Sequence, residues 1–298
     1  MSHVRAGERP AAGEEVVLSL ADPERLLRRV RLLQELWRPR VGPKFVRVDG
    51  RTVWQLPLRL PDVDRMEYKL ELTRADGAVE IECDPGNPLR APGPFGAKSV
   101  LELPAYRQPA WLPFEPPAGR TKTLDIPSRT LGATVALTIW SPPGIGWDRP
   151  LPLLVVHDGV EYREYSQLVQ FFEAGRAAGE LPFFRAALLH PLRRNRDYSA
   201  SVRYARALAH EILPRLERHA PTAGGRWPRA GMGTSLGALA MLHAHRTHPD
   251  RSAAFSSSRG ASSGSATTGT RSTSPISPAS PASSAGCWRP RCGRPRFR

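Results

Sequence analysis

Three short apolar segments alternate with segments of helical periodicity between residues 151 and 248. LPLLVVHDG (151–159) contains a wholly apolar run, which is typical of a strand buried on both faces of a sheet. FRAALLH (184–190) is a second buried strand, and PRAGMG (228–233) is a third, shorter one. Apolar residues at helical spacing follow each strand, the longest such stretch covering residues 199–220. The alternation predicts βαβ units on a parallel sheet.

The chain before residue 120 has a different pattern. TVWQLPLRL (52–60) and MEYKLELT (66–73) alternate apolar and polar residues, as half-buried antiparallel strands do. AVEIEC (78–83) and SVLELPAY (99–106) add two further strands, and TKTLDIP and LGATVALTIW begin the next region. The strands between residues 52 and 106 predict a small β-sandwich of about 100 residues, which is within the usual size of one domain.

Residues 22–37 are predicted to form a helix in front of these strands. Asp22 can cap it and Pro23 suits its first turn. Apolar residues then recur at helical spacing, namely Leu26, Val30, Leu33 and Trp37.

Gly233-Thr234-Ser235-Leu236-Gly237 stands between the third strand and its helix and matches G-x-S-x-G, the nucleophile elbow. The two glycines allow strand and helix to pack closely around a sharp turn that exposes the serine. The N–H of Leu236 begins a helix and can stabilise an oxyanion. An isolated match is weak, but strand, motif and helix occur here in the required order.

These motifs resemble the esterases of the α/β-hydrolase fold, most closely the enterochelin (ferric siderophore) esterase group. The resemblance covers residues from about 45 to 250. Its stretches in the N-terminal region are DRMEYKLEL, DPGNPLRAPGPFG and KSVLELP; those in the second region are LLVVHDGVEY, RDYSASVRYARALAHEILP and GMGTSLGALA.

The resemblance implies an α/β protein of two domains. Residues 1–119 would hold the N-terminal helix and an early-set immunoglobulin-like β-sandwich, and residues 120–250 an incomplete α/β-hydrolase domain. It also implies ester hydrolysis by a Ser-His-Asp triad without cofactor or metal. Ser235 matches the nucleophile, and the backbone of Leu236 and Gly159 would form the oxyanion hole.

Four side chains are candidates for substrate binding: Asp158, Tyr162, Arg193 and Arg196. Ligands of α/β sheets bind at the carboxyl ends of the strands, where these residues lie, and an iron-loaded siderophore is anionic. Two alternatives stay open. His157 and Asp158 can simply brace their turn, and the arginines, with Arg194, can form a solvated basic loop.

A base and an acid for the triad are missing after Ser235. In this fold the order is serine, acid, histidine, yet no Asp or Glu follows Asp250. His243, His245 and His248 lie on the predicted elbow helix, which carries them roughly 12–20 Å away at about 1.5 Å per residue.

Residues 251–298 are rich in Ser, Pro, Gly and Arg and are predicted to form a disordered, low-complexity tail. A shifted reading frame near codon 251 explains why the tail replaces the expected last strands. SAAFSSSRGASS can be encoded so that the other frame reads FGGLLLQSGSFF, an apolar, strand-like sequence.

Composition excludes several classes of function. The formal charge of +15 falls to +7 without the eight tail arginines, and no nucleic-acid-binding motif accompanies it. No signal peptide or membrane span is recognisable, and the only cysteine outside the tail is Cys83. The chain is therefore predicted to be a cytoplasmic serine esterase acting on a small-molecule ester such as an anionic siderophore, impaired by loss of the triad acid and histidine. The alternative is a non-catalytic binding protein of the same fold.

Overall fold

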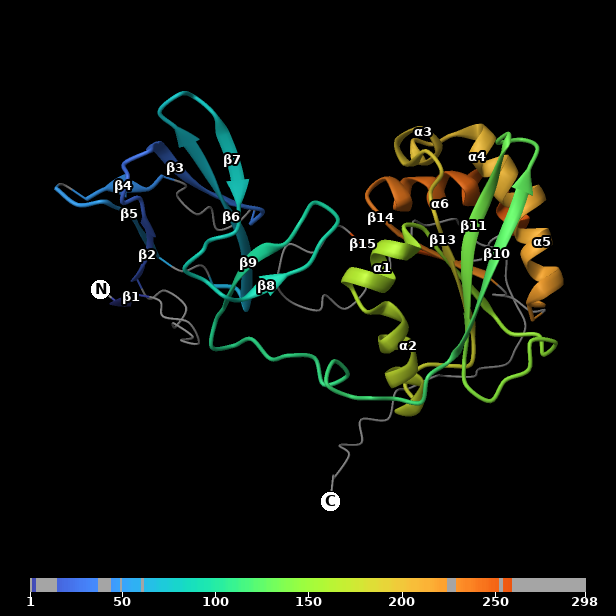
Figure 1. Ribbon diagram of the computed structural model, residues 1–298. Helices are drawn as coiled ribbons and strands as arrows, with labels where there is room; N and C mark the ends of the chain where they lie inside the picture. The colour runs from blue at the N-terminus through green and yellow to red at the C-terminus, as the bar shows by residue number, and fades with distance from the viewer. Residues whose placement is uncertain are drawn as a thin grey trace, which may run out of the picture. The chain divides into compact units, whose positions relative to one another are not determined.

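The computed structural model describes residues 2–3, 15–36, 44–48, 50–59, 62–223, 229–251 and 254–258. Its strands form three sheets (Figure 1). Two of these sheets lie in the N-terminal region, and the third lies in the region from residue 120 onward. None of the helices within the described ranges combines the length and the apolar character that a bilayer-spanning helix needs.

The N-terminal region consists of two sheets of mostly antiparallel strands around one core. The first sheet contains, in spatial order, β1 (Ser2–His3), β2 (Glu15–Ala21), β5 (Val53–Arg59) and β4 (Val46–Arg47). The second contains β3 (Leu27–Gln34), β6 (Arg65–Arg74), β9 (Lys98–Glu102) and β8 (Arg90–Ala91), with β7 (Val79–Glu82) also paired to β6. Both sheets contribute to one hydrophobic cluster, for example through Leu18, Trp54 and Leu70. The strands predicted between residues 52 and 106 are confirmed.

The predicted N-terminal helix is wrong, because Leu27–Gln34 forms strand β3. Val30 and Leu32 are buried at 1% and 2% exposure, while Arg29 and Arg31 alternate with them and pair with Glu71 on β6. This segment fits a period of two as well as a helical period, and the tertiary pairing decides between them. Trp37 lies outside the described residues.

Asp22, the predicted helix cap, has a different task. Its buried carboxylate accepts hydrogen bonds from the backbone N–H groups of Leu26 and Leu27 and from Trp54 Nε1, and it pairs with Arg47. These bonds lower the pKa of Asp22 against the opposing effect of its burial. The side chain therefore organises a turn between two sheets.

The second region contains one mixed sheet. In spatial order its strands are β10 (Arg120–Ser128), β11 (Ala133–Ser141), β13 (Arg185–Leu189), β12 (Leu153–Val156), β14 (Arg229–Thr234) and β15 (Ala254–Ser258). β10 and β11 are antiparallel, and the four strands from β13 to β15 are mutually parallel. The predicted parallel sheet is confirmed.

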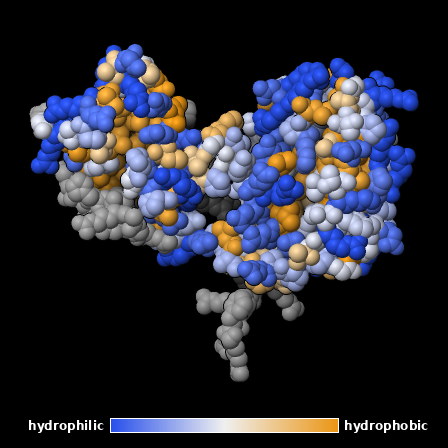
Figure 2. Space-filling model, in the orientation of Figure 1, coloured by the Kyte–Doolittle hydropathy of each residue, from blue (hydrophilic) through white to orange (hydrophobic). Residues whose placement is uncertain are grey.

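Helices cover both faces of this sheet (Figure 1). They are α1 (Gly159–Tyr165), α2 (Leu168–Ala177), α3 (Arg194–Tyr198), α4 (Val202–Ala207), the π-helix η1 (Leu208–Ile212), α5 (Leu213–His219), α6 (Leu236–Thr247) and the 3-10 helix η2 (Pro249–Arg251). α2 packs with β12 and β13 on one face, where Phe172, Val156 and Leu188 share a cluster. α4, η1, α5 and α6 pack on the other face. On the side drawn in Figure 2, this region is mostly hydrophilic with scattered apolar residues.

Strand β15 corrects the predicted tail. Residues 254–258 pair in parallel with residues 230–234 of β14, so the sheet continues past residue 251. Along the side of β14 that faces away from β12, backbone N–H and C=O groups are free to pair with a further strand. Such pairing uses only the backbone of that strand and does not depend on its side chains. The remainder of the predicted tail, from residue 259, lies outside the described residues.

Candidate active site

The loops at the carboxyl ends of three neighbouring parallel strands form the candidate site. β12 leads into His157 and Asp158, β13 into His190, and β14 into Ser235. β12 is the first of these strands in sequence but lies between the other two. The chain therefore leaves β12 toward one side and later returns to its other side, which creates the topological switch point where α/β sheets bind ligands.

Ser235 occupies a strained turn between β14 and α6. Its backbone has φ 54° and ψ −121°, a combination that a residue with a side chain rarely adopts. Ser235 is exposed, and its carbonyl accepts a hydrogen bond of 3.1 Å from the N–H of Leu239 in the first turn of α6. The predicted placement of Ser235 at the tip of a strand-to-helix turn is confirmed.

The two glycines of the motif have different neighbours. A Cβ on Gly233 would lie 2.5 Å from the carbonyl carbon of Gly237 and 2.7 Å from the N of Ala238, so strand and helix backbones touch there. A Cβ on Gly237 would lie 3.0 Å from Asp158 Oδ2 and 3.2 Å from His157 Cβ. The turn that carries Ser235 is thus packed directly against the loop after β12.

Asp158 is a second strained residue in this loop. It has φ 54° and ψ 42°, and its buried carboxylate forms a two-pronged ion pair with Arg194 on α3. Arg194 Nε lies 2.8 Å from Oδ1, and Nη2 lies 2.8 Å from Oδ2. The hydrogen bond to Asp158 raises the pKa of Arg194. The next residue, Gly159, packs so closely on Leu188 that a Cβ would lie 2.5 Å from its Cα.

His157 is fully buried beneath the loop and is neutral at physiological pH. Burial lowers the pKa of its imidazole to about 3. Its Nε2 lies 2.8 Å from the hydroxyl of Tyr204, and its ring centroid lies 4.7 Å from that of Tyr198. Burial raises the pKa values of both tyrosines. The three rings contact one another next to the loop after β12.

The remaining predicted residues lie near the same end of the sheet. The hydroxyl of Tyr162 on α1 is hydrogen-bonded to Thr234 Oγ1, directly before Ser235. Arg193 and Arg196 are both exposed, and Arg196 Nε lies 3.2 Å from Asp197 Oδ1. Sequence reasoning did not single out Arg194 from its neighbours, since nothing in the local sequence links it to an aspartate 36 positions earlier.

No imidazole or carboxylate of the described residues is hydrogen-bonded to Ser235. His243 and His245 lie on α6, and His248 caps its end, where its ring contacts that of His210. His190 is half-buried, and both its burial and the cation of Arg163 lower its pKa. Among the described residues, the exposed side chain of Ser235 therefore stands at the turn before α6 without a hydrogen bond to an imidazole or a carboxylate.

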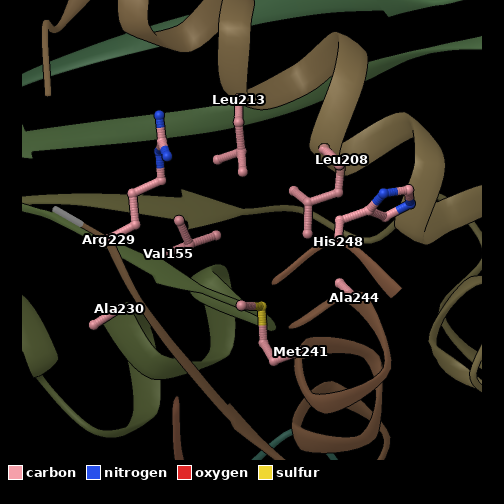
Figure 3. A pocket seen from close by; sticks show the side chains of 9 residues that line it. Val155, Leu208, Leu213, Arg229, Ala230, Met241, Ala244 and His248 are labelled. Carbon is pink, nitrogen blue, oxygen red and sulfur yellow. The ribbon is translucent and has the colours of Figure 1, made fainter. Parts of the chain in front are cut away.

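A separate apolar pocket lies in this domain, between the sheet and the face covered by η1, α5 and α6 (Figure 3). Val155, Leu213 and Met241 point into it from a strand and two helices. Arg229 also lines it, and this residue begins the strand that ends at Thr234. The pocket is thus near the amino end of β14 and does not include Ser235.

Residues 128–267 match a family model named Esterase and described as "Putative esterase", which covers just under half of the chain. The enterochelin esterase of Shigella flexneri is 23% identical, with a TM-score of 0.64 over 82% of this chain and 69% of that one. The chain resembles the enterochelin esterases in its fold. The ferric enterobactin esterase of Salmonella typhimurium is 21% identical, with a TM-score of 0.66 over 81% of this chain and 70% of that one. This esterase-like chain matches none of the curated proteins.

Proposed function

We propose that this chain is a serine carboxylic-ester hydrolase of the enterochelin esterase type that acts through Ser235. The observation that carries the proposal is the strained backbone of Ser235, with φ 54° and ψ −121°, at a turn where Gly233 touches the helix backbone. Backbone strain of this kind persists where the surrounding structure enforces it, and it is concentrated at functional sites. The esterase family match covers the same residues.

In the proposed reaction, Ser235 Oγ attacks the carbonyl carbon of an ester. The carbonyl π electrons move to its oxygen, and the N–H groups of Leu236 and Gly159 stabilise this oxyanion. Both residues follow a positive-φ residue and begin a helix, where the first N–H groups have no intrahelical partner. The hydroxyl proton of Ser235 passes to the triad histidine that we propose for the lost segment, and from there to the alcohol as it leaves. Water then attacks the acyl-enzyme, gives its proton back to Ser235 by the same route, and releases the acid.

The proposed substrate is a small ester with anionic character, such as a siderophore. A Shigella flexneri relative of the same fold was crystallised in the presence of enterobactin. Arg193 and Arg196 are exposed near the carboxyl ends of the strands and would attract a negative charge. Asp158 and Tyr162 are bonded to Arg194 and Thr234, so we propose that they shape the site from behind. We propose that the reaction needs no cofactor or metal and that the protein has no nucleic-acid partner. We also propose that the protein is located in the cytoplasm.

We also propose the predicted architecture: an immunoglobulin-like sandwich within residues 1–119, an incomplete hydrolase domain at 120–250, and an out-of-frame segment from 251. The position of β15 supports the last point. Parallel strands inside α/β sheets are normally rich in apolar residues, whereas β15 reads AFSSS. The other reading frame permits GLLLQ at these five positions. In that frame the lost segment would carry the acid and the histidine of the triad.

A non-catalytic binding protein is the second candidate. It is favoured by the lack of any imidazole or carboxylate bonded to Ser235 among the described residues. Such a protein would keep the oxyanion donors and the arginines and would bind the ester without cleaving it.

The test compares hydrolysis of p-nitrophenyl butyrate by the chain, by its Ser235→Ala variant, and by a version with one base restored at codon 252. We expect the restored version to hydrolyse the ester through Ser235, and the chain as it stands to be on the order of 10⁴- to 10⁶-fold slower. A restored version whose rate survives Ser235→Ala would exclude the esterase. Equal rates for the chain and the restored version would exclude the frameshift, and siderophore binding without turnover by both would favour the binding protein.

A further inference from the structure

An open pocket lies at the β10 edge of the sheet in the second region. It has a volume of about 520 Å³ and lies between the turn that joins β10 to β11 and the helical stretch that begins with α4, which are side by side in Figure 1. Six residues line it: Arg129, Thr130, Val202, Arg203, Arg206 and Glu211. Small-molecule sites usually have volumes of roughly 300–1,000 Å³, so this pocket has room for a small molecule.

The pocket is separate from the candidate active site. Residues 129–132 join β10 to β11, and two strands, β13 and β12, lie between β11 and β14, which ends directly before Ser235. Because neighbouring strands are about 4.8 Å apart, this turn lies roughly 14–19 Å from β14. The residues that line the pocket are also different from the four candidates for substrate binding.

Three of the lining side chains are arginines, and they come from two different elements. Arg129 is on the turn between β10 and β11, and Arg203 and Arg206 are about one turn apart on α4; all three are exposed. Within the part of the chain that the structure describes, no carboxylate forms an ion pair with any of them. Like charges one helical turn apart repel one another, so an anion bound between these arginines would relieve their repulsion.

Glu211 also lines the pocket, and both of its carboxylate oxygens are already engaged. Ser128 Oγ donates to Oε2, and Thr130 Oγ1 donates to Oε1 over 2.7 Å. Burial opposes ionisation, but these hydrogen bonds lower the pKa of Glu211 overall, so the carboxylate is charged at neutral pH. Three positive side chains and one negative one therefore leave the pocket with a net charge of about +2.

Two further features suit an organic anion. Arg203 Nη2 donates a hydrogen bond of 2.6 Å to the carbonyl oxygen of Thr130, which orients the guanidinium. An arginine has five N–H donors, so most of those of Arg203 stay available for a ligand. Val202 is 70% exposed and adds an apolar surface beside the arginines.

We propose that this pocket binds a small-molecule phosphomonoester, with the phosphate among the three arginines and the organic group against Val202. Guanidinium groups bind phosphate through paired, charge-assisted hydrogen bonds. A phosphomonoester carries a charge of about −1.5 to −2 at neutral pH, which matches the pocket, whereas a carboxylate or a sulfate ester carries a single negative charge. The proposal depends neither on the esterase function nor on the reading frame, since β15 lies at the opposite edge of the sheet.

Isothermal titration calorimetry of the chain tests the charge and the apolar surface. Phenyl sulfate resembles phenyl phosphate in shape but has one negative charge, so we expect phenyl phosphate to bind at least about tenfold more tightly. Inorganic phosphate lacks the ring and should bind about threefold more weakly than phenyl phosphate, and Val202→Ser should remove that difference. Equal affinities for phenyl phosphate and phenyl sulfate would overturn the proposal.

Arginine variants test the location. Arg129→Gln and Arg206→Gln should each weaken the binding of phenyl phosphate about tenfold, because each removes charge-assisted hydrogen bonds that come from a different element. Arg218→Gln is the matched control, since it changes the net charge equally at an exposed position of α5 outside the pocket. Arg218→Gln should bind phenyl phosphate as the parent does, and so should Arg193→Gln, which lies at the candidate active site.

Three results from these variants would overturn the proposal. Equal weakening by Arg218→Gln would show a diffuse effect of net charge. A loss with Arg193→Gln but not with Arg206→Gln would place the anion at the candidate active site. Tighter binding of a single-stranded DNA oligonucleotide or of vesicles that contain phosphatidic acid, reduced by the same two pocket variants, would replace the small molecule by a polymeric or membrane-bound phosphate.

Discussion

Two arginines stand at the two ends of β13, and their guanidinium groups are satisfied in opposite ways. Arg185 begins the strand and is buried at 1% exposure. It donates to neutral oxygens, including the carbonyls of Gly146 at 2.7 Å and Arg149 at 2.8 Å. Arg194 follows the carboxyl end of the strand, is partly exposed, and binds the carboxylate of Asp158.

The difference indicates that the two ends of the sheet have different roles: the amino end stabilises the fold, and the carboxyl end holds the candidate site. At the amino end, a buried cation gathers loop carbonyls, and this burial lowers the pKa of Arg185. At the carboxyl end, an ion pair restrains a strained loop beside a strained serine. Such ends of α/β sheets carry ligand sites. We therefore expect changes at the amino end to affect folding alone, and changes at the carboxyl end to affect Ser235 as well.

The largest effect is expected for Arg185→Met, which keeps an unbranched apolar side chain in place of the arginine stem and removes the guanidinium donors. Several carbonyls in part-buried hydrogen bonds would lose their donor, and each group left unsatisfied away from water costs about 1–3 kcal/mol. We expect a loss of about 4 kcal/mol in the free energy of unfolding, measured by urea denaturation. Exposed Arg206→Gln is the control and should change stability by less than about 0.5 kcal/mol. A loss below about 1 kcal/mol for Arg185→Met would show that these hydrogen bonds do not stabilise the amino end of the sheet.

Gly233→Ala should come next, with a loss of about 3 kcal/mol. Its methyl group would lie 2.5 Å from the carbonyl carbon of Gly237, so α6 must shift away from β14. Fluorophosphonate labelling of Ser235 in the frame-restored protein should fall with it. Gly237→Ala is the matched variant and should cost less, since its new methyl meets the side chains of Asp158 and His157 at 3.0–3.2 Å. Equal stabilities for the two variants would contradict this ranking.

Acid should destabilise the carboxyl end through His157. Its pKa is about 3 in the folded chain and near 6.5 when unfolded. The unfolded chain therefore binds the proton first, and stability falls as the pH drops from about 6.5 toward 3. The slope due to this residue is at most about 1.4 kcal/mol per pH unit. Urea unfolding between pH 7 and 4 should show a shallower slope for His157→Phe than for the parent, and identical slopes would refute the assignment.

The smallest effect is expected for Arg229→Gln at the amino end of β14. Arg229 Nε lies 2.6 Å from Glu217 Oε1, and both side chains are partly buried. Ion pairs near the surface contribute up to about 1 kcal/mol, so we expect a loss of that size in urea denaturation. Labelling of Ser235 should stay within twofold of the parent. A large loss of labelling at normal stability would show that the two ends of the strand are coupled.

The sequence predicts the parallel sheet and the Ser235 turn well, because both depend on local signals. Apolar runs such as Leu153–Val156 and the paired glycines around Ser235 are readable without knowledge of the fold. The pairing of Arg194 with Asp158 is not readable, because it requires the order of β12 and β13 in space. The helix predicted across Leu27–Gln34 is wrong because the apolar residues there suit two periods. β15 carries no apolar pattern, and its pairing depends on the free side of β14.

The π-helical turn at Leu208–Ile212 has a consequence for insertions and deletions. A π-turn holds one more residue per hydrogen-bonded loop than an α-turn, so the continuous helical stretch from Val202 to His219 contains spare length. Removing one residue inside the turn would convert it to ordinary α-helix, and Leu213 and Leu216 would keep their places in the core. The same deletion within α2, which has no such turn, would rotate the later residues of that helix by about 100° and move Phe172 off its cluster. Sequence alignments of this fold should therefore be expected to place one-residue gaps in the π-turn before they place them in its neighbours.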